Sequence, residues 1–159
     1  MPTLFVLVGL PGSGKTTFAK NNLKDTVRVC HDDLVAMLTG EWDVTRTQLY
    51  HALEWNLVHT CLSRNQNVVV DRTNLDLKTR ARFLNAAYNA ETSEPVHKVA
   101  IIFETPLDVC QERNHNLERI AAGRVVPEEE YIRLLSKFQP VVETEGFDEI
   151  VIAPQGNDG

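Results

Sequence analysis

The feature that most constrains this chain is a glycine-rich segment that follows an apolar run near the N-terminus. Residues 9–16 read G-L-P-G-S-G-K-T, the pattern G-x-x-x-x-G-K-[ST], and residues 4–8 are all apolar. The glycines let the backbone turn sharply so that its N–H groups converge, and a helix beginning at Lys15 adds the positive end of its dipole. The segment therefore predicts a phosphate-binding loop between a strand and a helix. A glycine-rich turn without a ligand is the structural alternative.

The residue types in this loop match a nucleoside triphosphate and a magnesium ion. Lys15 would reach the β- and γ-phosphates, and the Thr16 hydroxyl would hold Mg2+ bridging the same phosphates. ATP or another nucleoside triphosphate is the expected phosphate donor, with Mg2+ as cofactor. The predicted nucleotide-binding residues of the loop are Gly9, Leu10, Pro11, Gly12, Ser13, Gly14, Lys15, Thr16 and Thr17.

Short apolar runs alternate with helical stretches along the rest of the chain. The expected strands cover residues 4–8, 27–30, 68–70, 99–103 and 150–152, and the expected helices lie near residues 15–22, 33–38, 46–64, 77–90, 106–114 and 127–138. Near-continuous apolar runs are typical of strands buried on both faces. The predicted fold is therefore α/β, with a parallel sheet of about five strands flanked by helices, and its ligands should bind beyond the carboxyl ends of the strands.

The length of 159 residues indicates one domain, expected over residues 1–154, with residues 155–159 as a frayed polar tail. Residues 39–45 lack periodicity and predict a loop. The longest expected helix should be mostly core. Its predicted apolar stripe consists of Leu49, Leu53, Leu57 and Cys61 at helical spacing, widened by Trp55 and Val58.

Composition argues against several classes of protein. No run of about eighteen apolar residues exists and the N-terminal apolar stretch is too short for a signal peptide core, so no membrane contact and a cytoplasmic location are expected. The three cysteines and five histidines show no metal-binding spacing. The net charge is −6, but residues 1–138 hold sixteen basic and seventeen acidic residues, so a local basic cleft for a phosphate-bearing polymer stays open.

Two carboxylates follow the second expected strand, in the sequence Cys30-His31-Asp32-Asp33. Asp32 is the candidate general base, because a carboxylate that orients an attacking hydroxyl and takes its proton assists phosphoryl transfer. His31 directly precedes this base and is a candidate substrate contact. The structural alternative is that Asp32 or Asp33 caps the helix that follows.

The third expected strand ends in Asp71-Arg72-Thr73-Asn74. Asp71 stands where phosphate-loop enzymes have a second acidic residue and is predicted to support Mg2+ together with Thr16. Arg72, Thr73 and Asn74 are candidate substrate-binding residues. A turn whose side chains bond their own backbone is the alternative. Basic residues continue on the next helix at Lys78, Arg80 and Arg82, either as a solvated face or as a groove for a substrate phosphate.

Residues 113–127 predict a lid, because Gly123 and Pro127 bracket a segment that carries three arginines. A mobile guanidinium that closes over the triphosphate would stabilise charge on the transferred group. Arg113, Arg119 and Arg124 are the candidates, and Arg124 is also assigned a catalytic role together with Lys15 and Asp32. A helical hairpin whose arginines pair with nearby glutamates is the alternative.

Together, G-L-P-G-S-G-K-T-T, H-D-D-L, V-V-V-D-R-T-N-L, the segment ending G-R-V-V-P and E-T-E-G-F-D-E-I-V-I resemble the kinase domain of polynucleotide 5′-hydroxyl kinases over nearly the whole chain. The resemblance implies a single P-loop kinase domain in which Asp32 is the general base, Lys15 and Thr16 contact nucleotide and magnesium, and Arg124 is a lid arginine. The chain departs from the family pattern at His31, where a basic residue is frequent, and at Val35, where the phage enzyme has an arginine. Its lid is also longer than in the phage enzyme. The phosphatase motif D-x-D-G-T is absent, which predicts no 3′-phosphatase activity.

The leading hypothesis is transfer of the γ-phosphate to a 5′-hydroxyl end of DNA or RNA. The acceptor comes from the resemblance, since no pattern in the sequence reads base, sugar or strandedness. One alternative is a small-molecule kinase acting on a sugar, nucleoside or antibiotic hydroxyl. The other is a nucleotide-binding ATPase or switch without an acceptor.

Overall fold

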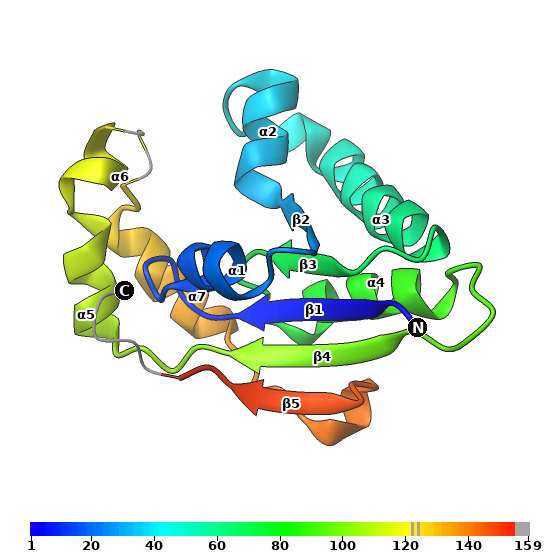
Figure 1. Cartoon of the computed structure of the whole chain (residues 1–159). Coiled ribbons are helices and arrows are strands. Elements are labelled where there is room, and N and C mark those ends of the chain that lie inside the picture. Colours follow the sequence, from blue (N-terminus) through cyan, green and yellow to red (C-terminus); the bar gives the residue numbers. More distant parts are fainter. Residues whose placement is uncertain (122, 124, 155–159) are drawn as a thin grey trace.

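The protein folds into a parallel sheet with helices on both faces (Figure 1), and the computed structural model describes residues 1–121, 123 and 125–154. The strands are β1 (Thr3–Val8), β2 (Val27–Cys30), β3 (Val68–Asp71), β4 (His97–Ile102) and β5 (Glu149–Ile152). They form one sheet in the order β2-β3-β1-β4-β5, which confirms the predicted α/β fold. In register, Leu4 of β1 lies between Val68 of β3 and Lys98 of β4. The loop that follows β1 therefore lies in the middle of the carboxyl edge.

The helices are α1 (Lys15–Asn22), α2 (His31–Thr39), α3 (Thr47–Ser63), α4 (Leu77–Tyr88), α5 (Leu107–Asn114), α6 (Leu117–Ala121) and α7 (Glu128–Lys137), with 3-10 turns at Val44–Arg46 and Glu143–Glu145. Since crossovers in a parallel sheet are right-handed, the step from β1 to β2 places α1 on the face opposite to the later helices. Figure 1 shows α1 in front of the sheet and α4 and α7 behind it. The front face is thus covered by less helix than the rear.

Alternate residues of β1 enter two different apolar clusters. Leu4, Val6 and Val8 pack into the larger cluster with residues of α3 and α4, while Leu7 packs into a smaller cluster with Ala19 of α1. Complete burial of each aliphatic side chain contributes about 1.5–3 kcal/mol relative to exposure. The two clusters hold β1, and with it the loop at its end, from both sides.

The predicted apolar face of the longest helix is correct at Val58 and wrong at Leu49 and Leu57. α3 buries Tyr50, Glu54, Val58 and Leu62, whereas Leu49 and Leu57 are 46% and 41% exposed. The i, i+4 spacing is correct, but the leucine stripe lies on the neighbouring face. Apolar periodicity does not predict a buried glutamate, because a carboxylate is buried only where other groups pair with it.

One further expectation from the sequence fails in part. The last expected strand does form as β5, but all four of its residues are exposed, because it lies at the edge of the described sheet. The segment of the predicted lid contains a short helix, α6, which agrees with the helical alternative for this segment. The expected frayed tail at residues 155–159 lies outside the described residues.

Arg80 is a structural residue and does not contribute to a phosphate groove. Its side chain is fully buried and donates to Glu145 at 2.7 Å and to the carbonyl oxygens of Asn74 and Gln139, both at 2.9 Å. These bonds fasten α4 to the segment between α7 and β5.

Within the part of the chain that the structure describes, no helix is long and apolar enough to cross a membrane.

Candidate active site

The phosphate loop has the backbone conformation that its glycines predict. Gly12 and Gly14 have φ values of +84° and +98°, in the region that residues with a side chain rarely adopt. A Cβ on Gly12 would lie 2.5 Å from the carbonyl oxygen of Cys110, so the loop lies directly against the backbone of α5. Both conformation and space therefore require glycine at position 12.

Contacts from other elements hold the outer side of this loop. The Tyr131 hydroxyl on α7 donates to the Pro11 carbonyl oxygen at 2.8 Å, and the Thr105 hydroxyl donates to the Ser13 carbonyl oxygen at 2.9 Å. The backbone N–H of Gly9 donates to the Thr73 carbonyl oxygen at 3.0 Å. Tyr131 was not identified from the sequence, because a tyrosine on a charged helix carries no signal of a distant partner.

Lys15 is buried and bends back over the loop. Its Nζ donates to the carbonyl oxygens of Leu10 at 2.7 Å and Gly9 at 2.9 Å, and to the Ser13 hydroxyl at 3.3 Å. Burial lowers the pKa of the Lys15 ammonium to about 8, although the nearby Asp71 carboxylate acts in the opposite direction. The ammonium is thus preorganised at the loop and holds its proton less tightly than an exposed lysine.

This pKa predicts a pH dependence of ATP binding. A bound triphosphate brings negative charge to Lys15 and raises its pKa, so above pH 8 binding must take up a proton. The Kd for ATP is therefore expected to rise above pH 8, by up to about tenfold per pH unit. Isothermal titration calorimetry between pH 7 and 9.5, in buffers of different ionisation enthalpy, measures both the Kd and the proton uptake. Lys15→Met should bind weakly with a flat profile; a flat wild-type profile would contradict the prediction.

Thr16 and Asp71 meet where Mg2+ is expected. Thr16 Oγ1 donates to Oδ2 of Asp71 at 2.8 Å. A hydroxyl and a carboxylate fit Mg2+, which commonly takes one or two protein oxygens and completes its shell with phosphate oxygens and water. Within residues 1–121, 123 and 125–154 no group of three His, Cys, Asp or Glu side chains is placed to hold a metal. The roles of Thr16 and Asp71 toward Mg2+ stay predictions.

Arg28, in the middle of β2, joins the carboxylates of this edge and was missed from the sequence. Its Nε donates to the same Asp71 oxygen at 2.8 Å, and its Nη1 donates to Asp33 at 2.9 Å. The pKa of Arg28 is raised, because these two carboxylates outweigh the effect of burial. The available signal was a single arginine inside an apolar strand, where a charge needs a partner.

Asp32 and Asp33 lie in the first turn of α2, and neither is its cap. The helix begins at His31, and its cap residue is Cys30, which makes no side-chain capping bond. Asp33 is paired with Arg28, whereas Asp32 is exposed and, among the described residues, makes no hydrogen bond or ion pair. The negative charge of Asp32 acts to raise the pKa of Lys15. Of the two carboxylates, Asp32 is therefore the one available to accept a proton next to the loop.

Glu54 of α3 holds the side chains of His31, Arg72 and Arg82 together. It is 1% exposed, accepts from Arg72 Nη1 at 2.9 Å, lies 2.8 Å from His31 Nδ1 and lies 3.9 Å from Arg82 Nη2. Burial acts to raise the pKa of the Glu54 carboxyl, but the hydrogen bond from His31 and the charges of Arg72, His31 and Arg82 outweigh it and lower that pKa. Glu54 is thus an ionised carboxylate in the core that holds Arg72 and His31 in place.

The other predicted substrate-binding residues have mainly backbone roles here. The Thr73 carbonyl oxygen accepts the N–H of Gly9, as described above. Asn74 is buried, with φ +47°, and its amide donates to the carbonyl oxygen of Leu7 at 2.7 Å. Their substrate-binding role stays a prediction. Thr17 is exposed on the first turn of α1.

The predicted lid packs beside the phosphate loop. Arg113 Nη1 donates to the Gly12 carbonyl oxygen at 3.3 Å. The positive charge of Arg119 acts to lower the pKa of Lys15. The buried Asn114 amide fastens the base of this segment by bonding both the N–H and the carbonyl oxygen of Val126, at 2.8 and 2.7 Å. Arg124, the predicted catalytic arginine of the lid, lies outside the described residues. The closing of this segment over a nucleotide stays a prediction.

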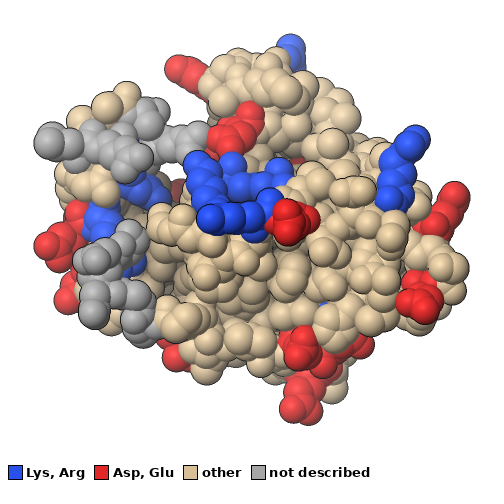
Figure 2. Space-filling model, in the orientation of Figure 1, with Lys and Arg blue, Asp and Glu red and all other residues tan. Residues whose placement is uncertain are grey.

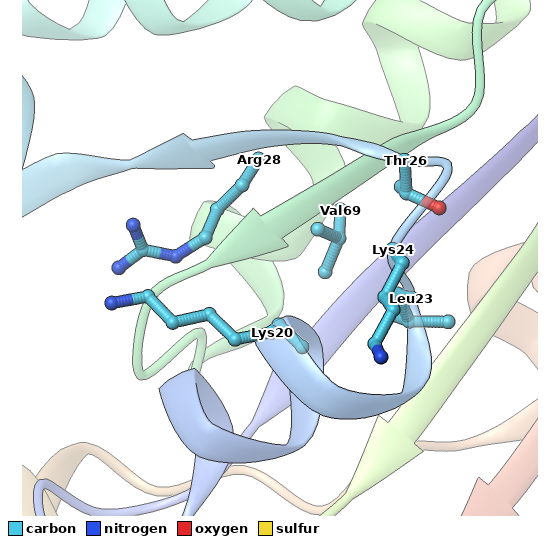
Figure 3. A pocket seen from close by; sticks show the side chains of 7 residues that line it. Lys20, Leu23, Lys24, Thr26, Arg28 and Val69 are labelled. Atoms are coloured by element: carbon cyan, nitrogen blue, oxygen red, sulfur yellow. The ribbon is translucent and has the colours of Figure 1, made fainter.

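A basic patch lies on the front face beside α1. Figure 2 shows blue side chains gathered where α1 and β2 lie in Figure 1. A pocket of about 270 Å³ here is lined by Lys20, Lys24, Arg28, Ala19, Leu23, Thr26 and Val69. Figure 3 shows Lys20 and Arg28 extending to one side of this pocket and Lys24 standing at its other end. The acidic chain therefore has a local basic surface next to the Arg28–Asp33 pair.

A lysine-bearing loop at the centre of a parallel sheet, with a threonine and an aspartate meeting beside it, defines the class of P-loop nucleotide-binding enzymes. A family model described as an AAA domain matches residues 4–141. The chain belongs to this family, and its loop has the form of a P-loop nucleotide-binding site.

Individual relatives differ in what they are named for. The chain is 30% identical over 124 residues to a protein of Acanthamoeba polyphaga mimivirus named as a bifunctional polynucleotide phosphatase/kinase, and the match covers 78% of the chain and 26% of that protein. It is 26% identical over 141 residues to the L-seryl-tRNA(Sec) kinase of Methanococcus maripaludis, with 85% and 52% covered. A chain in the solved structure of a Pnkp1/Rnl/Hen1 complex is 27% identical, with a TM-score of 0.61 and coverage of 73% and 40%. This chain therefore spans only part of the length of each.

Proposed function

We propose that this protein transfers the γ-phosphate of ATP to a 5′-hydroxyl end of DNA or RNA. The observation that carries the proposal is the position of Asp32, a carboxylate that is unpaired among the described side chains and whose charge acts on Lys15, next to the phosphate loop. The acceptor oxygen bonds to the γ-phosphorus as the bond from that phosphorus to the bridging oxygen breaks. The hydroxyl proton passes to Asp32, and ADP leaves.

The remaining residues of the edge hold the donor and balance its charge. Lys15 and the loop N–H groups bind the phosphates, and the lid arginines neutralise charge on the transferred group. Bound Mg2+, held by Thr16 and Asp71, would withdraw charge from the phosphate oxygens. Most of the rate enhancement in such a site comes from positioning the hydroxyl between Asp32 and the phosphate.

Two observations favour a polynucleotide over a small acceptor. Arg72 and Arg82 gather at Glu54, which also contacts His31, the residue before Asp32. Arg82 has a buried Nη1 without a hydrogen-bond partner among the described atoms. The basic pocket of Lys20, Lys24 and Arg28 offers a second place for backbone phosphates. Similarity to the mimivirus protein named as a polynucleotide phosphatase/kinase, and to a chain of the Pnkp1/Rnl/Hen1 complex, supports this acceptor.

A second candidate acceptor is the hydroxyl of a seryl group carried on RNA. The 26% identity to a protein named L-seryl-tRNA(Sec) kinase favours it, and the same Asp32 would serve as base. Both acceptors are hydroxyls carried by a nucleic acid, so a basic surface alone does not separate them.

Labelled ATP separates these acceptors directly. Purified protein is incubated with [γ-32P]ATP and Mg2+ together with 5′-hydroxyl DNA, 5′-hydroxyl RNA, the same oligonucleotides carrying a 5′-phosphate, seryl-tRNA, or simple sugars and nucleosides. The proposal expects label on the 5′-hydroxyl oligonucleotides and none on the 5′-phosphorylated controls. Label on seryl-tRNA or on a metabolite would replace the proposed acceptor, and label released only as free phosphate would indicate a nucleotide switch.

If the nucleic-acid strand of the acceptor runs along the basic pocket, reversing the charges of Lys20 and Lys24 should weaken binding of the acceptor but not of ATP. In Lys20→Glu/Lys24→Glu protein we expect the KM for a long 5′-hydroxyl oligonucleotide to rise by about tenfold at low salt, with the effect shrinking as salt increases. The KM for ATP should be unchanged, because neither lysine contacts the loop. The matched control is Arg64→Glu/Lys137→Glu, which reverses the same number of charges at exposed positions elsewhere on the molecule. An equal effect in both double variants would show that net charge, and not this pocket, is responsible.

A further inference from the structure

Three rings gather beside the candidate base: His31 on α2, Trp42 in the loop after α2, and Tyr50 on α3. The Trp42 ring lies 5.0 Å from that of Tyr50, tilted by 34°, and 5.3 Å from that of His31, tilted by 51°. Tyr50 is fully buried, whereas Trp42 is 50% exposed. His31 immediately precedes Asp32 in the first turn of α2, so the cluster reaches the place where the acceptor hydroxyl must lie.

The loop that carries Trp42 is held in place by the hydroxyl of Tyr50. This oxygen lies 2.7 Å from Thr39 Oγ1 and accepts the backbone N–H of Asp43 at 3.2 Å. Asp43 in turn accepts from the N–H of Thr45 at 3.0 Å. The indole is therefore preorganised with one face on the protein, and a ligand that stacks on it needs to order little of the chain.

Because half of the Trp42 surface is exposed to water, this side chain lacks the stabilisation that complete burial would bring. A flat π-system that stacks on it recovers this stabilisation, and base–aromatic stacking contributes about 1–3 kcal/mol per base. Arg72 and Arg82 pair with Glu54, which also contacts His31 of this cluster, and they carry the charge that a nucleotide's phosphate needs. Rings and cations linked in this way match a nucleotide better than an acceptor without a base.

We propose that Trp42 is the platform on which the base of the acceptor's 5′-terminal nucleotide stacks, which places its 5′-hydroxyl at Asp32. This inference rests on the proposed 5′-hydroxyl kinase function and deepens it, because it assigns a binding site to the terminal base itself. Stacking is tolerant of base identity, since every base has a π-face. The enzyme would therefore require a base at the 5′ end without requiring a particular one.

The test pairs one change in the enzyme with one change in the substrate. Acceptors of the same sequence carry either a normal 5′-terminal nucleotide or an abasic 5′-terminal sugar with its hydroxyl, and KM and kcat are measured with wild-type and Trp42→Ala protein. With wild-type protein, loss of the base should raise KM by about 5- to 150-fold. With Trp42→Ala, both acceptors should show the same high KM, because the second change removes nothing further.

Two variants serve as controls. Trp42→Phe keeps a ring and should retain most of the discrimination between the two acceptors. Trp55→Ala removes the other tryptophan, which stacks on His59 at 4.8 Å on α3, and should leave KM for both acceptors at the wild-type value. Additive effects of Trp42→Ala and base loss, or a wild-type KM in Trp42→Ala, would overturn the inference while leaving the kinase function intact.

Failure of the proposed function has a different signature. If wild-type protein transfers no phosphate to either acceptor, the 5′-kinase proposal is wrong. Fluorescence of the Trp55→Phe protein, in which Trp42 is the remaining tryptophan, then tests stacking by itself. Quenching by the normal oligonucleotide and weaker quenching by the abasic one would support a base platform; equal quenching, or none, would reject it.

Discussion

Asp32→Asn is expected to lower kcat for phosphoryl transfer by about 10²- to 10⁴-fold, the usual contribution of a general base. The amide keeps the size of the side chain but cannot take the proton of the acceptor hydroxyl. ATP binding should persist, because Asp32 forms no bond to the described phosphate loop and the loop is held by other contacts, such as that of Tyr131 with Pro11. Single-turnover transfer assays give the rate, and calorimetry gives the Kd for ATP.

Asp33→Asn is the matched control for this result. It makes the same chemical change one residue away, in a carboxylate that is paired with Arg28 at 2.9 Å. We expect a smaller loss of kcat, which would reflect the disturbed Arg28–Asp71 pair. If Asp32→Asn keeps kcat within about tenfold of wild type, or if Asp33→Asn has the larger effect, Asp32 is not the base.

The sequence predicted well the features that depend on neighbouring residues or on the regular geometry of a parallel sheet. The pattern G-L-P-G-S-G-K-T places strand, loop and helix next to one another in the chain, and the positive φ values of Gly12 and Gly14 follow from the same pattern. The approach of Thr16 to Asp71 was also predicted, because the carboxyl ends of adjacent parallel strands meet at one edge. In both cases local sequence or regular sheet geometry determines where the residues lie.

The sequence failed where a residue's role depends on a partner far along the chain. Glu54 lies on a helix face that looked less apolar than its neighbour, and only Arg72, Arg82 and His31 make its burial favourable. Arg80 looked like part of a basic face, but its carboxylate partner, Glu145, lies 65 residues away. Pairings of this kind require the tertiary structure, since periodicity carries no information on charge partners.

The largest effect on stability is expected at Glu54. Glu54→Gln keeps the shape of the side chain but leaves Arg72 and Arg82 without their buried carboxylate, and breaking a buried charge pair costs about 3–5 kcal/mol. Chemical denaturation of wild type and Glu54→Gln at pH 7, fitted with a two-state model, measures the difference in the free energy of unfolding. Because the pKa of Glu54 is lowered in the folded protein, its contribution is present at neutral pH and is lost as pH falls through that folded-state pKa. The difference between wild type and variant should therefore shrink in acid below pH 4.5.

Arg82→Met tests whether the effect of Glu54→Gln comes from loss of charge pairing or from general disturbance of the side chains around Glu54. The Arg82 guanidinium is 3.9 Å from Glu54, and both burial and the charge of Arg72 lower its pKa. Its removal should change the free energy of unfolding by less than about 1 kcal/mol, because an apolar replacement avoids the desolvation of a poorly paired charge. The double variant Glu54→Gln/Arg82→Met should then be more stable than Glu54→Gln alone, since one uncompensated cation has been removed. If Arg82→Met changes the free energy of unfolding by the same amount in wild type and in Glu54→Gln, Arg82 does not interact with Glu54, and Arg72 and His31 alone account for the burial of this carboxylate.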